Sequence, residues 1–122
     1  MAKKYEPFDR IAKDGFFAER AVHYGVLYPK LREVAHRLGY ALTLHGSLQT
    51  DLDVVAVPWV EDAAPEQELV TALVEACGGY LVAGRGEGVE RFRTRKPHGR
   101  QVWTIHLDRA GYIDLGVMPR IQ

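Results

Sequence analysis

The chain has 122 residues, 47% of them hydrophobic, and its 16 Lys and Arg residues balance 16 Asp and Glu residues. This length suffices for one domain with a hydrophobic core and is too short for two. The balanced charge provides no overall basic field to attract nucleic acid, and no apolar run approaches the roughly 20 residues of a transmembrane helix. The first residues lack the apolar segment of a signal peptide, and the single cysteine, Cys77, excludes an internal disulfide. We therefore expect an intracellular, cytoplasmic protein without a membrane partner.

The N-terminal residues 1–28 are interpreted as a helical or lid segment that precedes the main part of a single domain, residues 29–122. The apolar residues that favour a short helix or lid around Gly15 are Phe8, Ile11, Phe16 and Phe17. The hydrophobic pattern becomes regular near Pro29, and the boundary is placed there for that reason.

An amphipathic helix is predicted next. The apolar residues that recur at helical spacing are Leu27, Leu31, Val34 and Leu38. Pro29 suits the first turn of this helix, because the missing N–H costs little there. Gly39 suits its C-terminal stop.

The rest of the chain alternates strands with one further helix. That helix is predicted to begin at Pro65 and to end at Gly78–Gly79, with Glu66 and Glu68 near its positive end. The residues expected on its buried face are Leu69, Leu73 and Ala76. Strands are predicted at residues 40–47, 51–59, 80–84 and 111–119, with a glycine-rich loop at 85–90 and a hairpin at 91–107 that turns at Pro97–His98–Gly99. This order predicts an α+β fold, a mixed β-sheet flanked by helices.

Two aspartates open the predicted strand at residues 51–59. Because side chains alternate across a strand, Asp51 and Asp53 point to the same face. Like charges at this spacing repel one another unless a cation lies between them. One interpretation is therefore a divalent metal site. The alternative is that Asp51 caps the turn while Asp53 lies at a solvated edge.

A third aspartate favours the metal interpretation. Asp114 lies between Ile113 and Leu115 inside another apolar strand, where a carboxylate is costly unless it is paired, protonated or metal-bound. If this strand lies beside the one that carries Asp53, three carboxylates converge. Such a cluster suits hard divalent cations that bridge phosphates during displacement at phosphorus.

These residues resemble a known motif set. The chain has Gly46–Ser47, then Asp51-Leu52-Asp53, then Asp114 between apolar residues. This order resembles that of the DNA polymerase β-like nucleotidyltransferase superfamily, and small single-domain members such as the minimal nucleotidyltransferases are most similar. The resemblance spans roughly residues 31–119, and it implies a nucleotidyltransferase-like mixed sheet flanked by helices.

The resemblance also implies roles for particular residues. Gly46 and Ser47 would contact the phosphates of a nucleoside triphosphate. Asp51, Asp53 and Asp114 would be the metal ligands and the catalytic acids, with Mg²⁺ or Mn²⁺ as the cofactor, and Asp114 would activate the attacking hydroxyl. The product of such a reaction is a nucleoside monophosphate attached to a hydroxyl of a protein, an RNA or a small molecule.

One departure from that family leaves a second function open. Only Leu48, Gln49 and Thr50 separate Gly46–Ser47 from the paired acids, whereas family members usually have a longer segment there. The alternative to a transferase is therefore a non-catalytic protein of the same fold. Such a protein would bind nucleotide or nucleic acid as a regulator, or would sequester or neutralise a partner.

A basic hairpin supplies candidate phosphate ligands. It holds five of the 16 Lys and Arg residues, namely Arg91, Arg93, Arg95, Lys96 and Arg100, and His98 adds a conditional charge. Lys96, His98 and Arg100 are the candidate nucleotide-binding residues. The alternative is a solvated hairpin whose charges protect an edge strand. His45 is either a phosphate-proximal or a structural histidine, and Trp103 is expected in the core because it alternates with Ile105 and Leu107.

Overall fold

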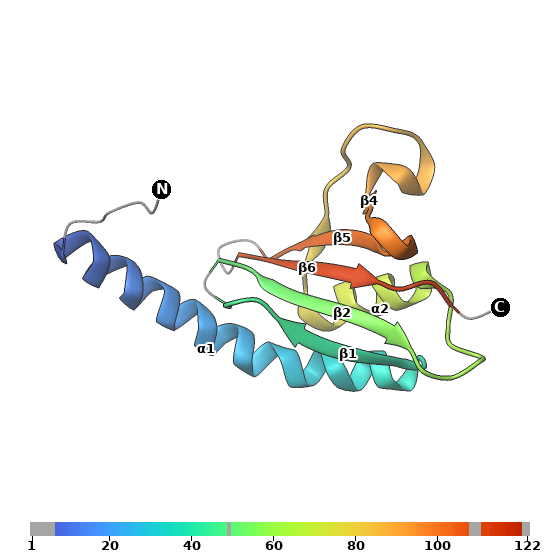
Figure 1. Cartoon of the computed structure of the whole chain (residues 1–122), viewed down its shortest axis with the longest axis horizontal. Coiled ribbons are helices and arrows are strands. Elements are labelled where there is room, and N and C mark those ends of the chain that lie inside the picture. Colours follow the sequence, from blue (N-terminus) through green and yellow to red (C-terminus); the bar gives the residue numbers. More distant parts are fainter. Residues whose placement is uncertain (1–6, 49, 108–110, 121–122) are drawn as a thin grey trace.

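The computed structural model describes residues 7–48, 50–107 and 111–120, with side chains from Arg20 onward. The helices and strands, in chain order, are α1 (Pro7–Arg37), β1 (Tyr40–His45), β2 (Leu52–Pro58), α2 (Glu66–Cys77), β3 (Tyr80–Leu81), β4 (Arg93–Arg95), β5 (Gln101–His106) and β6 (Tyr112–Val117). Two short 3₁₀ turns, η1 (Gly88–Arg91) and η2 (Pro97–Gly99), flank β4. The predicted α+β class is confirmed (Figure 1).

The sheet is mixed, with six strands in the order β1-β2-β6-β5-β3, and β4 also pairs with β5. β2 and β6 are parallel neighbours, and the other pairs are antiparallel. The last strand in the chain is therefore inserted next to β2, at the centre of the sheet. This insertion places Asp53 directly beside Asp114.

Both helices cover one face of the sheet, and their apolar side chains form one core with the strands. In β2 the buried residues alternate with less buried ones, so that Leu52, Val54 and Ala56 point toward the helices. Trp103 is in this core with an exposed fraction of 3%, as predicted from its alternation with Ile105. The opposite face carries the half-buried and exposed side chains, and we call it the open face.

The predicted start of the first helix is wrong. α1 runs from Pro7 to Arg37, so Pro29 lies inside the helix, and α1 crosses the predicted boundary at residues 28 and 29 without a break. An internal proline loses one backbone hydrogen bond and crowds the carbonyl four residues earlier. Tyr24 and Leu27, which precede the proline, are both buried. The buried face of α1 therefore continues on both sides of the missing hydrogen bond. The short helix or lid predicted around Gly15 is part of this one long helix. The side chains on which that prediction rested, Phe8, Ile11, Phe16 and Phe17, lie outside the described side chains.

The other predicted ends of helices agree with the structure. Gly39, with a φ of 89°, follows the end of α1, and Gly78, with a φ of 67°, caps α2. The predicted buried face of α2 is partly wrong, because Ala76 is exposed and Val70 is buried instead. The predicted strand at residues 80–84 is reduced to Tyr80–Leu81.

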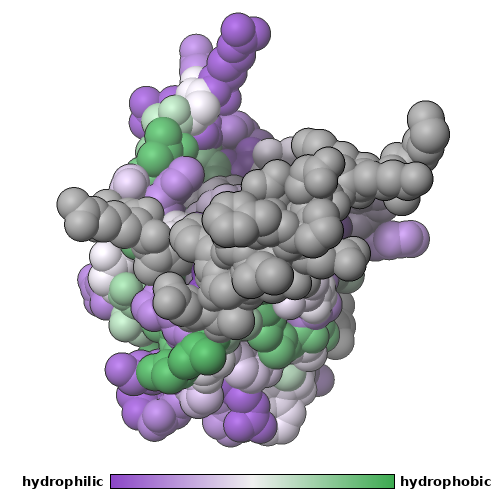
Figure 2. All heavy atoms as spheres, turned by 90° about the vertical axis from the view of Figure 1, so that its left-hand side faces the viewer, coloured by the Kyte–Doolittle hydropathy of each residue, from purple (hydrophilic) through white to green (hydrophobic). Residues whose placement is uncertain are grey.

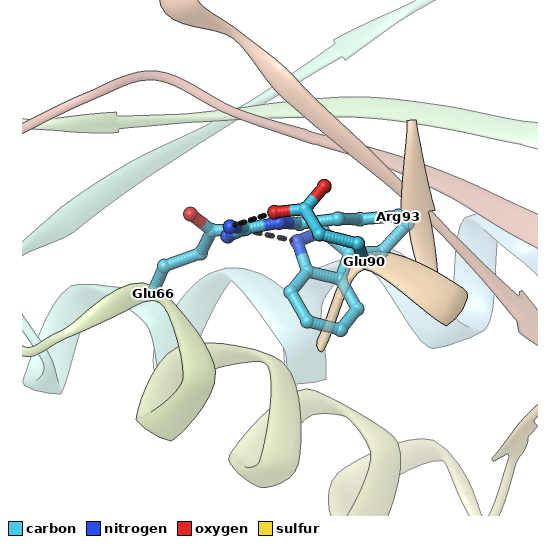
Figure 3. A network of polar contacts seen from close by, with 4 residues as sticks. Glu66, Glu90 and Arg93 are labelled. Atoms are coloured by element: carbon cyan, nitrogen blue, oxygen red, sulfur yellow. Dashed lines mark hydrogen bonds and ion pairs between the residues drawn. The ribbon is translucent and has the colours of Figure 1, made fainter. Parts of the chain in front are cut away.

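An ionic network fastens the hairpin of β4 and β5 to α2 (Figure 3). Arg93 donates to Glu66 on α2 at 2.9 Å and to Glu90 at 2.7 Å. The indole N–H of Trp103 donates to the same oxygen of Glu66 at 2.6 Å. One arginine thus contacts two carboxylates, so each of these two acids has a cationic partner within the fold.

The end of the molecule at which β2 and β6 begin is shown in Figure 2. On the described residues visible there, hydrophobic areas are separated by hydrophilic ones. Among the described residues, no helix is both long and apolar enough to cross a membrane.

Candidate functional site

A single row of polar side chains crosses four strands on the open face. The register aligns His45 of β1 with Asp53 of β2, Asp53 with Asp114 of β6, and Asp114 with Thr104 of β5. Neighbouring residues in aligned strands point to the same side of a sheet. The parallel pairing of β2 and β6 therefore brings together Asp53 and Asp114, which are far apart in the sequence.

The three predicted acids form a compact cluster, which we call the acid cluster (Asp51, Asp53 and Asp114). One carboxylate oxygen from each lies within 4.8 Å of the others, and all three side chains are half-buried. Thr50 donates to Asp51 at 3.1 Å, and Thr104 donates to Asp114 at 3.2 Å. The structure thus brings together all three residues that the sequence predicted, and the cluster could hold a metal ion.

The close approach of these acids changes their affinity for protons. Burial, a hydrogen bond with Asp51 and the charge of Asp51 raise the pKa of Asp114 from 3.8 to about 6. Burial and the neighbouring Asp51 also raise the pKa of Asp53. Burial raises the pKa of Asp51 as well, but hydrogen bonds from Asp114, Asp53 and Thr50 outweigh it, so that pKa is lowered. The cluster therefore favours one shared proton, or one cation, over three free negative charges.

The turn at Gly46–Ser47 adjoins the acid cluster. Gly46 has a φ of 79°, and a Cβ at this position would collide with Oδ2 of Asp53. Only glycine combines this backbone conformation with so close an approach at little cost. Ser47 is exposed at the same turn, and Leu48 follows with a φ of 63°, which is unusual for a residue with a side chain. Gln49 lies outside the described residues.

The predicted cations lie farther along the open face. A Cβ on Gly116 would lie 3.1 Å from Nη1 of Arg100, so the Arg100 side chain covers Gly116, two residues beyond Asp114 on the same face. Lys96 and His98 are exposed at the turn that precedes Gln101. Since Gln101 aligns with Val117, this turn is about 10 Å from Asp114 along the strand. Arg100 is thus the cation placed closest to the acids on this strand pair.

Helix α1 contributes residues that the sequence analysis missed. Arg20 and the Tyr24 hydroxyl donate to the carbonyl oxygen of Thr50, at 3.0 and 3.1 Å. These bonds hold the short connection from which Asp51 projects. The sequence contains no signal for them, because residues 20 and 50 are brought together only by the packing of α1 against β1.

Tyr112 was also missed, although its position contained a signal. It precedes Asp114 by two residues and therefore points to the same face of β6. The negative charge of Asp51 is the main reason that the pKa of Tyr112 is raised, and Arg20 acts in the opposite direction. The tyrosine hydroxyl thus lies within the electric field of the acid cluster.

The donor set fits a hard divalent cation. Carboxylate oxygens are the protein ligands that Mg²⁺ takes, at about 2.0–2.1 Å. Three such oxygens, from β2, β6 and the residue just before β2, can converge on one ion and leave its remaining positions to water or phosphate. The set contains only carboxylate oxygens, with no sulfur ligand, and His45 is the histidine aligned with Asp53.

Comparison of the chain with protein-family models, with curated proteins and with solved structures returns no match. The function is therefore inferred from the geometry of the site.

Proposed function

We propose that the protein binds a nucleotide together with Mg²⁺ or Mn²⁺ at the acid cluster and transfers a nucleoside monophosphate to a hydroxyl acceptor. The observation that carries this proposal is the convergence of three carboxylates within 4.8 Å on neighbouring strands. Their mutual repulsion is a cost to the fold that a divalent cation would remove.

The surrounding residues support a phosphate ligand. Asp51, Asp53 and Asp114 would hold the metal, which when bound neutralises phosphate charge. The backbone at Gly46 lies against the carboxylate of Asp53, so a phosphate that binds a metal ion held by Asp53 would lie next to this turn. Arg100, over Gly116, offers a guanidinium on the same face for phosphate oxygens.

The proposed reaction is an in-line displacement at the α-phosphorus. The oxygen of an acceptor hydroxyl forms a bond to the phosphorus, the bond from phosphorus to the β-phosphate oxygen breaks, and pyrophosphate leaves. The acceptor loses its proton to a carboxylate of the site or to water. Catalysis of this kind consists mainly of positioning and charge neutralisation, which the rigid strands β2 and β6 can supply.

A second candidate is a non-catalytic nucleotide-binding protein with the same site. The specific observation that favours it is the short connection between Ser47 and Asp51, in which Leu48 adopts a positive φ of 63°. A connection of this length offers few backbone N–H groups to a triphosphate. Binding that persists without turnover is the expected behaviour of this candidate.

Both candidates are tested with labelled ATP, CTP, GTP and UTP in the presence of Mg²⁺ or Mn²⁺. Binding is measured directly, and transfer is measured as label attached to protein or RNA. Asp51→Asn should abolish transfer, and Lys96→Ala with Arg100→Ala should weaken binding in a salt-sensitive way. Asp62→Asn is the matched control, since it removes one exposed carboxylate outside the acid cluster.

The outcomes separate the candidates. Transfer by the wild type that Asp51→Asn removes and Asp62→Asn retains supports the transferase. Metal-dependent binding without transfer supports the non-catalytic protein. Absence of both binding and transfer with all four nucleotides would overturn the proposal.

A further inference from the structure

Three ring-bearing side chains form a continuous row on the sheet, beside the acid cluster. Tyr80 of β3 aligns with His106 of β5, and His106 aligns with Tyr112 of β6. The ring centroids of Tyr80 and His106 are 5.5 Å apart in a stacked arrangement, and those of His106 and Tyr112 are 6.4 Å apart and tilted. We call these three residues the aromatic row.

The aromatic row is accessible to a ligand. Tyr80 has an exposed fraction of 44% and Tyr112 of 36%, and His106 between them is half-buried. The row lies on the face opposite the two helices, since the residues that alternate with it, Ile105 and Ile113, are buried in the core. The hydrophobic core lies on the other face of the sheet, so these exposed rings do not contribute to it.

The order of side chains along β6 relates this row to the proposed reaction. Three successive outward positions are Tyr112, then Asp114, then Gly116, which is covered by Arg100. Rings, carboxylates and a cation thus follow one another at steps of two residues, about 7 Å each. A ligand with planar rings at one end and phosphates at the other matches this order.

The length of the aromatic row favours a single-stranded nucleic acid over a mononucleotide as its ligand. The centroids lie 5.5 and 6.4 Å apart, so that the row extends across three strands. A single base covers one ring, whereas aromatic residues on a sheet surface commonly stack two or three successive bases of a single-stranded nucleic acid. On the same face, the Arg100 guanidinium lies over Gly116, where it can contact the phosphates of the nucleic acid.

We infer that the aromatic row binds the unpaired end of a single-stranded nucleic acid by stacking bases on the exposed rings at its two ends, Tyr112 and Tyr80. The inference rests on the proposed function, because it identifies the acceptor whose terminal hydroxyl would reach the acid cluster. The acid cluster repels the phosphates of such a strand until a divalent cation is bound. Binding should therefore increase when Mg²⁺ is added, the reverse of simple ionic screening.

The test is fluorescence anisotropy with 5′-labelled single-stranded RNA and DNA of about six nucleotides, each titrated in EDTA and in millimolar Mg²⁺. Tyr80→Ala and Tyr112→Ala should each weaken binding by at least about fivefold, the low end for loss of one base–aromatic stack. Tyr80→Phe keeps the ring and should bind as the wild type does. Trp59→Ala is the matched control, because Trp59 is 57% exposed and stacks on His36 at 5.3 Å, away from the row.

The wild type and each variant are first compared by circular dichroism, and Tyr80→Leu, which keeps apolar bulk without a ring, replaces Tyr80→Ala if the latter unfolds. Loss of affinity in the ring-deleted variants but not in Trp59→Ala supports the inference. Failure of the wild type to bind either oligonucleotide in Mg²⁺ overturns it, as does equal binding by all variants.

The same titrations distinguish this inference from the proposed function. If Mg²⁺ stabilises the wild type but no oligonucleotide binds, the aromatic row is not a nucleic-acid site and the metal site stands. If oligonucleotides bind through the rings in EDTA and Mg²⁺ has no effect on binding or stability, the aromatic row is a site and the metal-dependent function fails.

Discussion

Two groups of acidic residues in this protein differ in how their charge is compensated. Glu66 and Glu90 both accept hydrogen bonds from Arg93, and Glu66 also accepts one from Trp103 (Figure 3). In the acid cluster, by contrast, the hydroxyls of Thr50 and Thr104 donate to Asp51 and Asp114. Burial and the neighbouring acids raise the pKa of Asp114.

Under the proposed function, this difference separates the structural role of Glu66 and Glu90 from the metal-binding role of the acid cluster. A carboxylate that meets a guanidinium and an indole N–H is satisfied by the fold, and here it joins a hairpin to a helix. A group of carboxylates that raises the pKa of one member to about 6 is not satisfied by the fold alone. Perturbed acids of this kind are typical of sites that await a ligand.

The largest expected effect comes from removing Arg93, the cation that Glu66 and Glu90 share. Arg93→Met leaves Glu66 and Glu90 without their cation, and both Arg93 and Glu66 are less than a quarter exposed, at 17% and 23%. We expect a loss of about 2–3 kcal/mol in the free energy of unfolding, somewhat below the cost of breaking a fully buried pair. The measurement is urea unfolding. Arg95→Met is the control, because Arg95 is an exposed arginine on the same strand, and it should cost less than about 0.5 kcal/mol. An equal loss of stability in both variants would show that the contacts of Arg93 with Glu66 and Glu90 do not stabilise the fold.

The next largest effect is expected when a divalent cation is added to the acid cluster. At a Mg²⁺ concentration about tenfold above its dissociation constant, the wild type should gain about 1.4 kcal/mol in stability. Asp53→Asn should lose most of this gain, while Asp62→Asn keeps it. Thermal unfolding with and without Mg²⁺ measures the difference. If Mg²⁺ shifts the melting temperature of Asp53→Asn as much as that of the wild type, the acid cluster is not a metal site.

A smaller effect tests the turn that supports Asp53. Gly46→Ala should cost about 1 kcal/mol for its positive φ, and the added Cβ should also displace Oδ2 of Asp53. Gly78→Ala is the matched control, since Gly78 has a φ of 67° and no atom within 4 Å of an added Cβ. Both variants should be destabilised to a similar extent, but only Gly46→Ala should lose the stabilisation by Mg²⁺.

The smallest expected effect is the pH dependence of the metal-free protein. The pKa of Asp114 rises from 3.8 to about 6 on folding, so between these values the folded state binds more protons than the unfolded state. Stability must therefore fall as the pH rises from about 4 through about 6. Because Asp114 is partly exposed, the loss should be no more than about 1 kcal/mol. The lowered pKa of Asp51 acts in the opposite direction, below pH 3.8.

Asp114→Asn isolates this contribution. The variant should be more stable than the wild type at pH 7–8 in EDTA, by about 1 kcal/mol or less, and the difference should vanish near pH 4. Urea unfolding across this pH range measures it. A variant that is less stable than the wild type at pH 7–8 would show that the Asp114 carboxylate is already compensated.

Local patterns in the sequence determined much of this protein. The spacing of apolar residues predicted α2, the hairpin and the central strands, because each element buries one face with its own period. Alternation placed Asp51 and Asp53 on one face, and the apolar neighbours of Asp114 marked it as anomalous. The three residues of the acid cluster were therefore accessible from the sequence.

Only the tertiary structure decided how far α1 extends and what surrounds the acids. The local pattern predicted that a helix begins at Pro29, but Tyr24 and Leu27 before it are also buried in the core, and α1 continues through the proline despite the lost hydrogen bond. The pairing of β6 with β2 aligned Asp53 with Asp114, and the pairing of β6 with β5 aligned Tyr112 with His106. Asp53 and Asp114 are far apart in the chain, and the order of the strands depends on the burial of the whole sheet rather than on any local pattern.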